Sequence, residues 1–157
     1  MASAPVLTGG ALSSANEVGG VLGFGGVSIA GMHEEDSYYS FNLAAGITIA
    51  NVGFCVAVDP TGPTQAKLCG ANDIILGRLE TVETRVVEGI NVGAVTTEGG
   101  MVVPLDTTAG ATLPAVGDSV QGGTVPGTVV KLAAAQGRNN VVVSVDTVGM
   151  TAVVLFL

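Results

Sequence analysis

Residues able to perform acid–base, nucleophilic or redox chemistry are few and scattered along this chain. His33 is the single histidine among 157 residues, so a serine or cysteine nucleophile would have to use it as its base. It follows a glycine-rich stretch, where nothing in the sequence holds an imidazole within hydrogen-bond reach of a nucleophile. The segment Gly117-Asp118-Ser119 is a turn signal before a short strand and has no base partner. The sequence therefore predicts no catalytic residue and no enzymatic activity.

The run His33-Glu34-Glu35-Asp36 is the best candidate for a metal site. Neighbouring residues of an extended chain point to opposite sides, so at most two of these side chains converge. Protein metal sites usually need three or four ligands. We interpret the run as a solvated acidic patch, with a divalent cation shared at the axis of a trimer as the alternative. The glycines between residues 19 and 26 lack the lysine and the following helix of a phosphate-binding loop, so no cofactor is expected.

The two cysteines, Cys55 and Cys69, have neither CxxC spacing nor histidine partners, so no zinc site is expected. They flank the strongest turn signal in the chain, residues 59–64, with the sequence Asp-Pro-Thr-Gly-Pro-Thr. A hairpin folded about Gly62 places the two cysteines opposite each other. They are then either a pair of small buried thiols or a cross-strand disulfide, and a cytosolic site of synthesis favours free thiols.

In the register set by this turn, the two faces of the hairpin differ in composition. The face predicted to join the core contains Phe54, Val56, Val58, Ala66 and Leu68. The other face is small and mixed and is predicted to be half-exposed; it contains Cys55, Ala57, Gln65, Lys67 and Cys69.

The whole chain has the pattern of an all-β protein. Helical periodicity is almost absent, and only residues 129–136 could form a helical turn as an alternative to a strand. Short β-branched runs alternate with Gly, Pro, Asn and Asp, as in a compact β-sandwich or barrel-like domain. Strands are predicted at 38–43, 53–58, 65–69, 74–84, 91–97, 101–104, 119–120, 128–132, 141–145 and 152–157.

Residues 1–35 differ from the β-domain predicted for residues 36–157. They are rich in Ala, Ser and Gly and suggest an extended N-terminal arm with one strand at 27–30. An arm that carries large apolar side chains is expected to lie on a neighbouring subunit or on a partner. The predicted partner-binding residues are Val21, Leu22, Phe24 and Ile29.

Composition limits the partners of the chain. It is 48% hydrophobic and only 11% charged, which favours an oligomer that buries part of its surface. Thirteen acidic and five basic residues give a net charge of −8, which argues against nucleic acid and against an anionic membrane surface. Residues 1–5 lack the basic start of a signal peptide, and the uncharged stretch 18–32 is too short to span a bilayer. Synthesis in the cytoplasm is therefore expected.

The segments that follow the hairpin occur in a suggestive order. They are residues 74–80 (IILGRLE), 89–95 (GINVGAV), 117–120 (GDSV) and the apolar end 151–157 (TAVVLFL). Their order and spacing over residues 44–157 resemble small capsid decoration, or cement, proteins of tailed bacteriophages. The resemblance implies a compact β-domain that forms a homotrimer on the outside of the phage head. There it would bind the major capsid protein and stabilise contacts between capsid subunits.

A carbohydrate- or ligand-binding β module of a virion or surface protein is the alternative. Such modules usually present aromatic platforms to sugars. This chain has no Trp, two Tyr and four Phe, and the adjacent Tyr38 and Tyr39 would point to opposite faces of a strand. The composition therefore favours the decoration protein.

Overall fold

The computed structural model describes residues 38–133 and 140–157. These residues form an all-β domain, as predicted, with a single 3-10 turn, η3 (Ile49–Asn51), in the described part. The strands are β1 (Tyr38–Leu43), β2 (Cys55–Asp59), β3 (Gln65–Leu68), β4 (Gly77–Leu79), β5 (Glu83–Arg85), β6 (Ile90–Thr96), β7 (Gly99–Pro104), β8 (Val120–Gly122), β9 (Val129–Lys131), β10 (Asn140–Asp146) and β11 (Thr151–Phe156).

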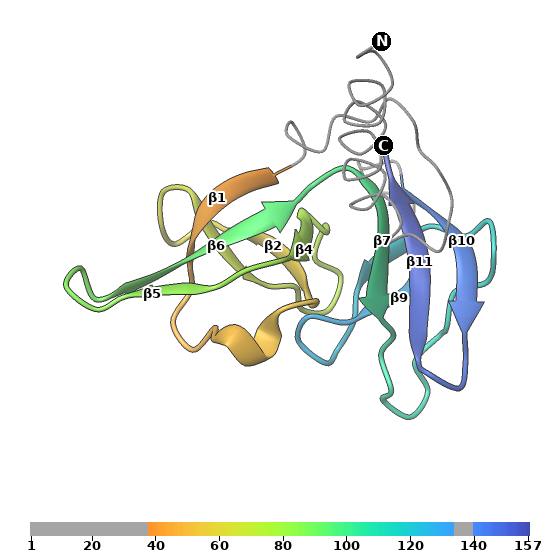
Figure 1. Cartoon of the computed structure of the whole chain (residues 1–157). Helices are drawn as coiled ribbons and strands as arrows, with labels where there is room; N and C mark the ends of the chain where they lie inside the picture. Colours follow the sequence, from red (N-terminus) through yellow and green to blue (C-terminus); the bar gives the residue numbers. More distant parts are fainter. Residues whose placement is uncertain (1–37, 134–139) are drawn as a thin grey trace, which may run out of the picture. The chain divides into compact units, whose positions relative to one another are not determined.

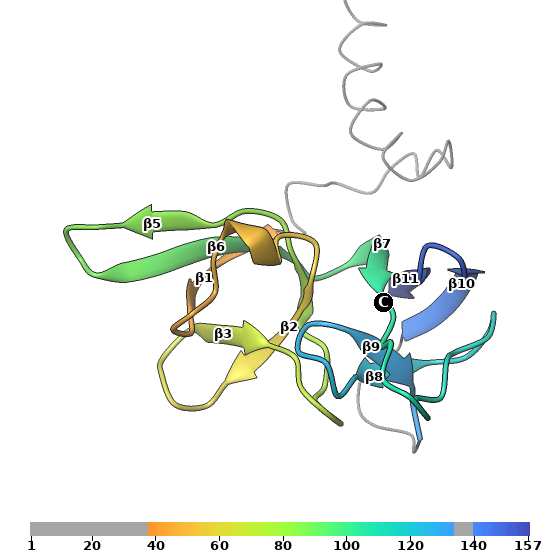
Figure 2. The ribbon, with the colours of Figure 1, turned by 90° about the horizontal axis from the view of Figure 1, so that it is seen from below.

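Five strands close into a barrel in the order β1-β3-β2-β4-β6, because β1 and β6 also pair with each other (Figures 1 and 2). The β1–β3 pair is parallel and the other pairs are antiparallel. Strand β5 lies outside the ring and pairs only with β6, in a hairpin that projects from the barrel. The barrel interior is filled by Leu43, Ile47, Val56, Ala66, Leu79 and Val95.

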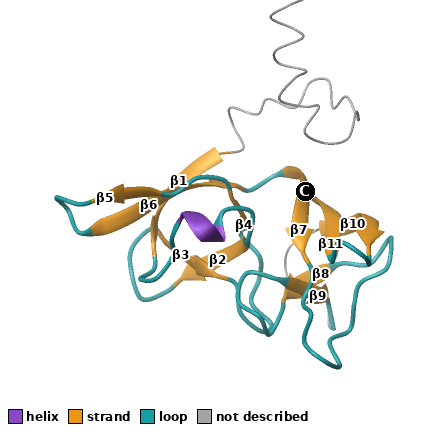
Figure 3. Cartoon of the chain, turned by 60° about the horizontal axis from the view of Figure 1, so that its bottom comes forward, coloured by secondary structure: helices purple, strands orange, loops and turns teal. Residues whose placement is uncertain are grey.

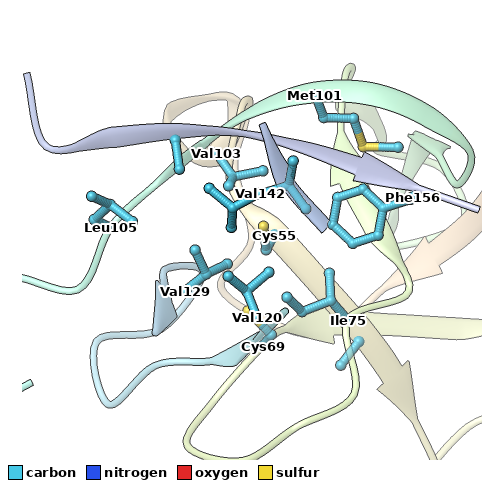
Figure 4. Packing of buried hydrophobic residues seen from close by; sticks show 13 residues of the cluster. Cys55, Cys69, Ile75, Met101, Val103, Leu105, Val120, Val129, Val142 and Phe156 are labelled. Atoms are coloured by element: carbon cyan, nitrogen blue, oxygen red, sulfur yellow. The ribbon is translucent and has the colours of Figure 1, made fainter. Parts of the chain in front are cut away.

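A second group of strands surrounds a separate core. Strands β10, β11 and β7 form an antiparallel sheet, and β8 pairs with β9 (Figure 3). Their inward side chains meet residues from the outside of the barrel wall, so that β2 is buried on both faces (Figure 4). The main members of this second core are Cys55, Cys69, Ile75, Met101, Val103, Val142, Val154 and Phe156.

The hairpin register predicted from Gly62 is confirmed. Val56 lies opposite Leu68 and Val58 opposite Ala66. On the predicted core face Val56 and Ala66 are buried, but Val58 at the end of the strand is 59% exposed. The expectation of a half-exposed second face is wrong for Cys55, Ala57 and Cys69, which are buried. The second core covers this face, and the small side chains let it approach closely.

The single strand predicted at residues 74–84 is two strands, β4 and β5. Between them the hydroxyl oxygen of Thr81 accepts a hydrogen bond from the amide of Ala94 at 3.2 Å. A side chain therefore replaces a backbone carbonyl and interrupts the ladder at this point. Gly77 in β4 is required where it stands, because a Cβ there would lie 2.0 Å from the carbonyl oxygen of Thr96 in β6.

Residues 129–131 form a strand, so the helical alternative for residues 129–136 is wrong in its described part. The N-terminal arm predicted for residues 1–35 and its strand at 27–30 lie outside the described residues. The predicted β-domain is described from residue 38 onward.

Candidate interaction surfaces

The outer face of the β10-β11-β7 sheet is the first candidate interaction surface of the described domain. The register places three rows of side chains on it, because residues directly opposite each other share a face. The rows are Gly100–Leu155–Val141, Val102–Val153–Ser144 and Pro104–Thr151–Asp146. Val143 lies in a bulge between the first two rows and is 49% exposed. We call this surface the outer sheet face.

Antiparallel sheets with one solvated face usually alternate apolar and polar side chains. Here the first two rows of the second face are also apolar except for Ser144, whereas the end row contains Thr151 and the single charged side chain, Asp146. The side chain of Val102 is 40% exposed, and those of Val153 and Leu155 are half-buried by other side chains of the same domain. A contiguous apolar patch of this kind is typical of an interaction site. The uninterrupted apolar run at residues 152–157 could have indicated this surface from the sequence. Strands that are covered on both faces lack the alternation of apolar and polar residues.

The tip of the β5–β6 hairpin is a second apolar surface. Val86 is 83% exposed and Val87 is fully exposed, and Ile90 lies beside them at 40%. The turn is closed by the amide of Gly89, which donates to the carbonyl of Arg85 at 2.9 Å. We call Val86, Val87 and Ile90 the hairpin tip.

The charges beside the hairpin tip are paired with one another. The Arg85 guanidinium lies 3.6 Å from Glu83 and 3.8 Å from Glu88. These exposed ion pairs stabilise the turn only slightly. They leave the valines as the projecting apolar feature of the hairpin.

A shallow hollow of about 490 Å³ opens beside the barrel wall. It is lined by Ala57, Val58 and residues 72–76. The polar groups on its rim are engaged within the protein, since Lys67 lies 3.0 Å from Asp73 and the Gln121 amide donates to the Asn72 side chain at 2.9 Å. The hollow is therefore a weaker binding candidate than the two apolar surfaces.

The Gly117-Asp118-Ser119 segment has a structural role. The Asp118 carboxylate accepts the amide of Ala115 at 2.8 Å and lies 2.9 Å from the Lys131 ammonium. The hydrogen bond from Ala115, followed by that from Lys131, lowers the pKa of Asp118. The Ser119 hydroxyl donates to the carbonyl of Asn140 at 2.7 Å. These contacts fix the loop before β8, as expected of a turn.

Asp106 is a buried carboxylate that organises the loops around β9. Burial acts to raise its pKa, but hydrogen bonds from Thr108, Val125 and Thr124 outweigh it and lower the pKa. The amide of Thr108 donates at 2.7 Å and that of Val125 at 3.1 Å. The carboxylate is thus an anionic clamp for two loops.

The cysteines are free and fully buried. The Cys69 thiol donates to the carbonyl of Thr128 at 3.3 Å. A hydrogen bond with Cys69, together with burial, raises the pKa of Cys55 well above that of an ordinary thiol. Neither cysteine therefore has the solvent access that a nucleophile needs, and the raised pKa of Cys55 disfavours its thiolate.

The predicted partner-binding residues Val21, Leu22, Phe24 and Ile29 lie outside the described residues, as does the acidic run at 33–36. Within residues 38–133 and 140–157 no three His, Cys, Asp or Glu side chains gather in a way that could hold a metal ion. The same residues contain no helix long and apolar enough to cross a membrane. Comparison of the chain with protein-family models, with curated proteins and with solved structures gives no match.

Proposed function

We propose that this chain is a capsid decoration protein that binds the outside of a phage head as a homotrimer and stabilises contacts between major capsid subunits. The observation that carries the proposal is the outer sheet face, whose first two rows contain no charged side chain, as expected of a domain that joins other copies in a trimer. A protein with net charge −8 gains solubility from its acidic residues. An apolar face on such a protein is expected at a surface that another subunit covers.

The internal packing of the domain suits a protein that stabilises a capsid. Two apolar cores share the barrel wall, and the connecting loops are tied to the strands by Asp106, Asp118 and Asn140. The side-chain amide of Asn140 pairs with both backbone groups of Val120, at 2.7 and 3.1 Å. Such a domain holds its contact surfaces in fixed positions. Three copies held together then bind a shell more tightly than one, through effective concentration.

The ligand-binding alternative has less support. Among the aromatic side chains that the structure describes, Phe156 is buried and Phe41 and Phe54 are partly buried. Tyr39 is exposed. One exposed ring makes a poor platform for a sugar compared with the stacked rings that such sites use.

Co-sedimentation tests the proposal. Labelled protein is mixed with expanded, DNA-free heads of the phage that encodes it, and with the same heads before expansion. We expect saturable pelleting with expanded heads, competition by unlabelled protein, and a higher melting temperature of the decorated heads. Protein that stays in the supernatant at every concentration, or that pellets without changing head stability, contradicts the proposal.

A further inference from the structure

We propose that copies of this chain associate head to tail, with the hairpin tip of one copy packed on the outer sheet face of the next. The inference rests on the homotrimer in the proposed function and names the two surfaces that would form it. The occupant of the outer sheet face is therefore a second copy of the chain.

The two surfaces lie at opposite ends of the described domain. Figures 1, 2 and 3 all show the β5–β6 hairpin on one side and the β10-β11-β7 sheet on the other. A copy therefore cannot cover its own outer sheet face with its own hairpin tip. An interface between two different patches of identical chains is heterologous, and it closes into a ring when the rotation between copies allows.

Charge favours this pairing over other contacts between copies. Each copy has a net charge of −8, so most approaches of two copies bring like charges together. The first two rows of the outer sheet face contain no charged side chain. At the hairpin tip Val86 and Val87 project beyond Arg85, whose charge is paired with Glu83 and Glu88. The tip and the face can therefore meet without desolvating an unpaired charge.

The size of the face limits the strength of a single contact. Three strands of about six residues cover on the order of 300 Å² at ordinary strand spacing and rise. A stable interface between two proteins usually buries about 800 Å² on each partner. One tip-to-face contact alone is thus weak. A ring in which every copy gives one tip and one face strengthens each contact through the others.

Charge substitutions test the two surfaces. Val87→Lys alters the tip and Val153→Lys the face, while Val58→Lys is the matched control, because Val58 is an exposed strand valine on the barrel. Light scattering of the full chain should give about three times 15.4 kDa for the wild type and the control. It should give one copy for the tip and face variants. Circular dichroism melting confirms that each variant is folded. A folded Val87→Lys or Val153→Lys variant that remains a trimer overturns the proposal.

Cross-linking tests the pairing itself. Val87→Cys and Val153→Cys are made in separate chains and treated with a short bifunctional cross-linker that reacts with thiols. The reagent does not reach the buried native cysteines. The mixture should give covalent dimers, each variant alone should give none, and a chain with both substitutions should give covalent trimers. Cross-linking of either variant with itself indicates a symmetric contact and overturns the proposal. So does a mixture that forms no cross-links.

The outcomes separate this inference from the proposed function. A trimer that follows these rules but does not bind heads supports the pairing and contradicts decoration. If both substituted chains remain trimers and bind heads, the result supports decoration and contradicts the pairing. A wild-type chain that is monomeric at high concentration contradicts the trimer and the pairing together.

Discussion

The amide of Cys55 donates a hydrogen bond to the carbonyl of Gly127 at 2.8 Å. The amide of Gly127 in turn donates to the carbonyl of Cys69 at 2.7 Å, and the amide of Cys69 donates to the carbonyl of Cys55 at 3.0 Å. A single glycine between β8 and β9 is thus inserted at the open end of the β2–β3 hairpin. This triangle of backbone contacts joins the barrel wall to the second core.

Gly127 should be one of the least replaceable residues of the domain. Its φ is +83°, and a Cβ there would lie 2.6–2.9 Å from three atoms of the Phe54 side chain. We expect Gly127→Ala to lower the free energy of unfolding by about 3 kcal/mol, from backbone strain and overpacking together. Urea denaturation measures the change.

Gly110→Ala is the matched control for this substitution. Gly110 has a similar φ of +88°, but a Cβ there would meet nothing within 4 Å. Only the backbone strain remains, so the expected loss is about 1 kcal/mol. Equal losses at the two positions would show that the contact with Phe54 contributes nothing.

The two thiols should react only when the protein unfolds. Cys55 and Cys69 are fully buried, and the raised pKa of Cys55 suppresses its thiolate at neutral pH. A thiol-specific chromogenic reagent should therefore label no cysteine in the native chain and both in denaturant without reductant. Labelling of the native chain as fast as of a free thiol would contradict the burial, and a count below two in denaturant would indicate a disulfide.

Acid should destabilise the domain, partly through Asp106. Its pKa is lowered in the folded state, so its contribution to stability is present above the unfolded pKa of about 3.9. That contribution is lost as the pH falls through the folded value. The pKa values of Asp59 and Asp118 are lowered as well. We expect stability to fall as the pH drops below about 4, measured by urea denaturation across the pH range.

The Asp106→Asn variant isolates the contribution of this carboxylate to the pH dependence of stability. The variant keeps an oxygen acceptor but loses the charge, so it should be less stable at pH 7 by on the order of 2 kcal/mol. The difference from the wild type should shrink in acid, where the wild-type carboxylate is also neutral. Glu88→Gln at the exposed hairpin is the control and should change little. A difference that stays constant with pH would assign the loss to packing instead of charge.

The N-terminal residues should be dispensable for folding of the β-domain. Both cores consist of residues from position 41 onward in the described part of the chain. Deletion of residues 1–35 should therefore leave a cooperative thermal transition and a β-type circular dichroism spectrum. Under the proposed function, head affinity or trimer stability should also fall, because the predicted partner-binding residues Val21, Leu22, Phe24 and Ile29 are removed; each such side chain contributes about 1.5–3 kcal/mol when fully buried. An unfolded deletion variant would place these residues in the core.

Local patterns in the sequence determined most strands and one register. The turn at residues 59–64 favours the pairing of Val56 with Leu68, because its proline and glycine residues set where the flanking strands end and begin. Alternation and turn residues also placed β1, β6, β10 and β11 close to their observed bounds. These features follow from turn residues and from the alternation of side chains within each segment.

Only the tertiary structure decided which faces are covered. Alternation separates the two faces of the β2–β3 hairpin, but it does not show that a second layer will bury Cys55 and Cys69. Closure of the barrel through β1 and β6, and the interruption between β4 and β5 by the hydroxyl of Thr81, likewise depend on partners distant in the chain. Pairings of this kind are chosen by the packing of the whole domain, because each local segment is compatible with several neighbours.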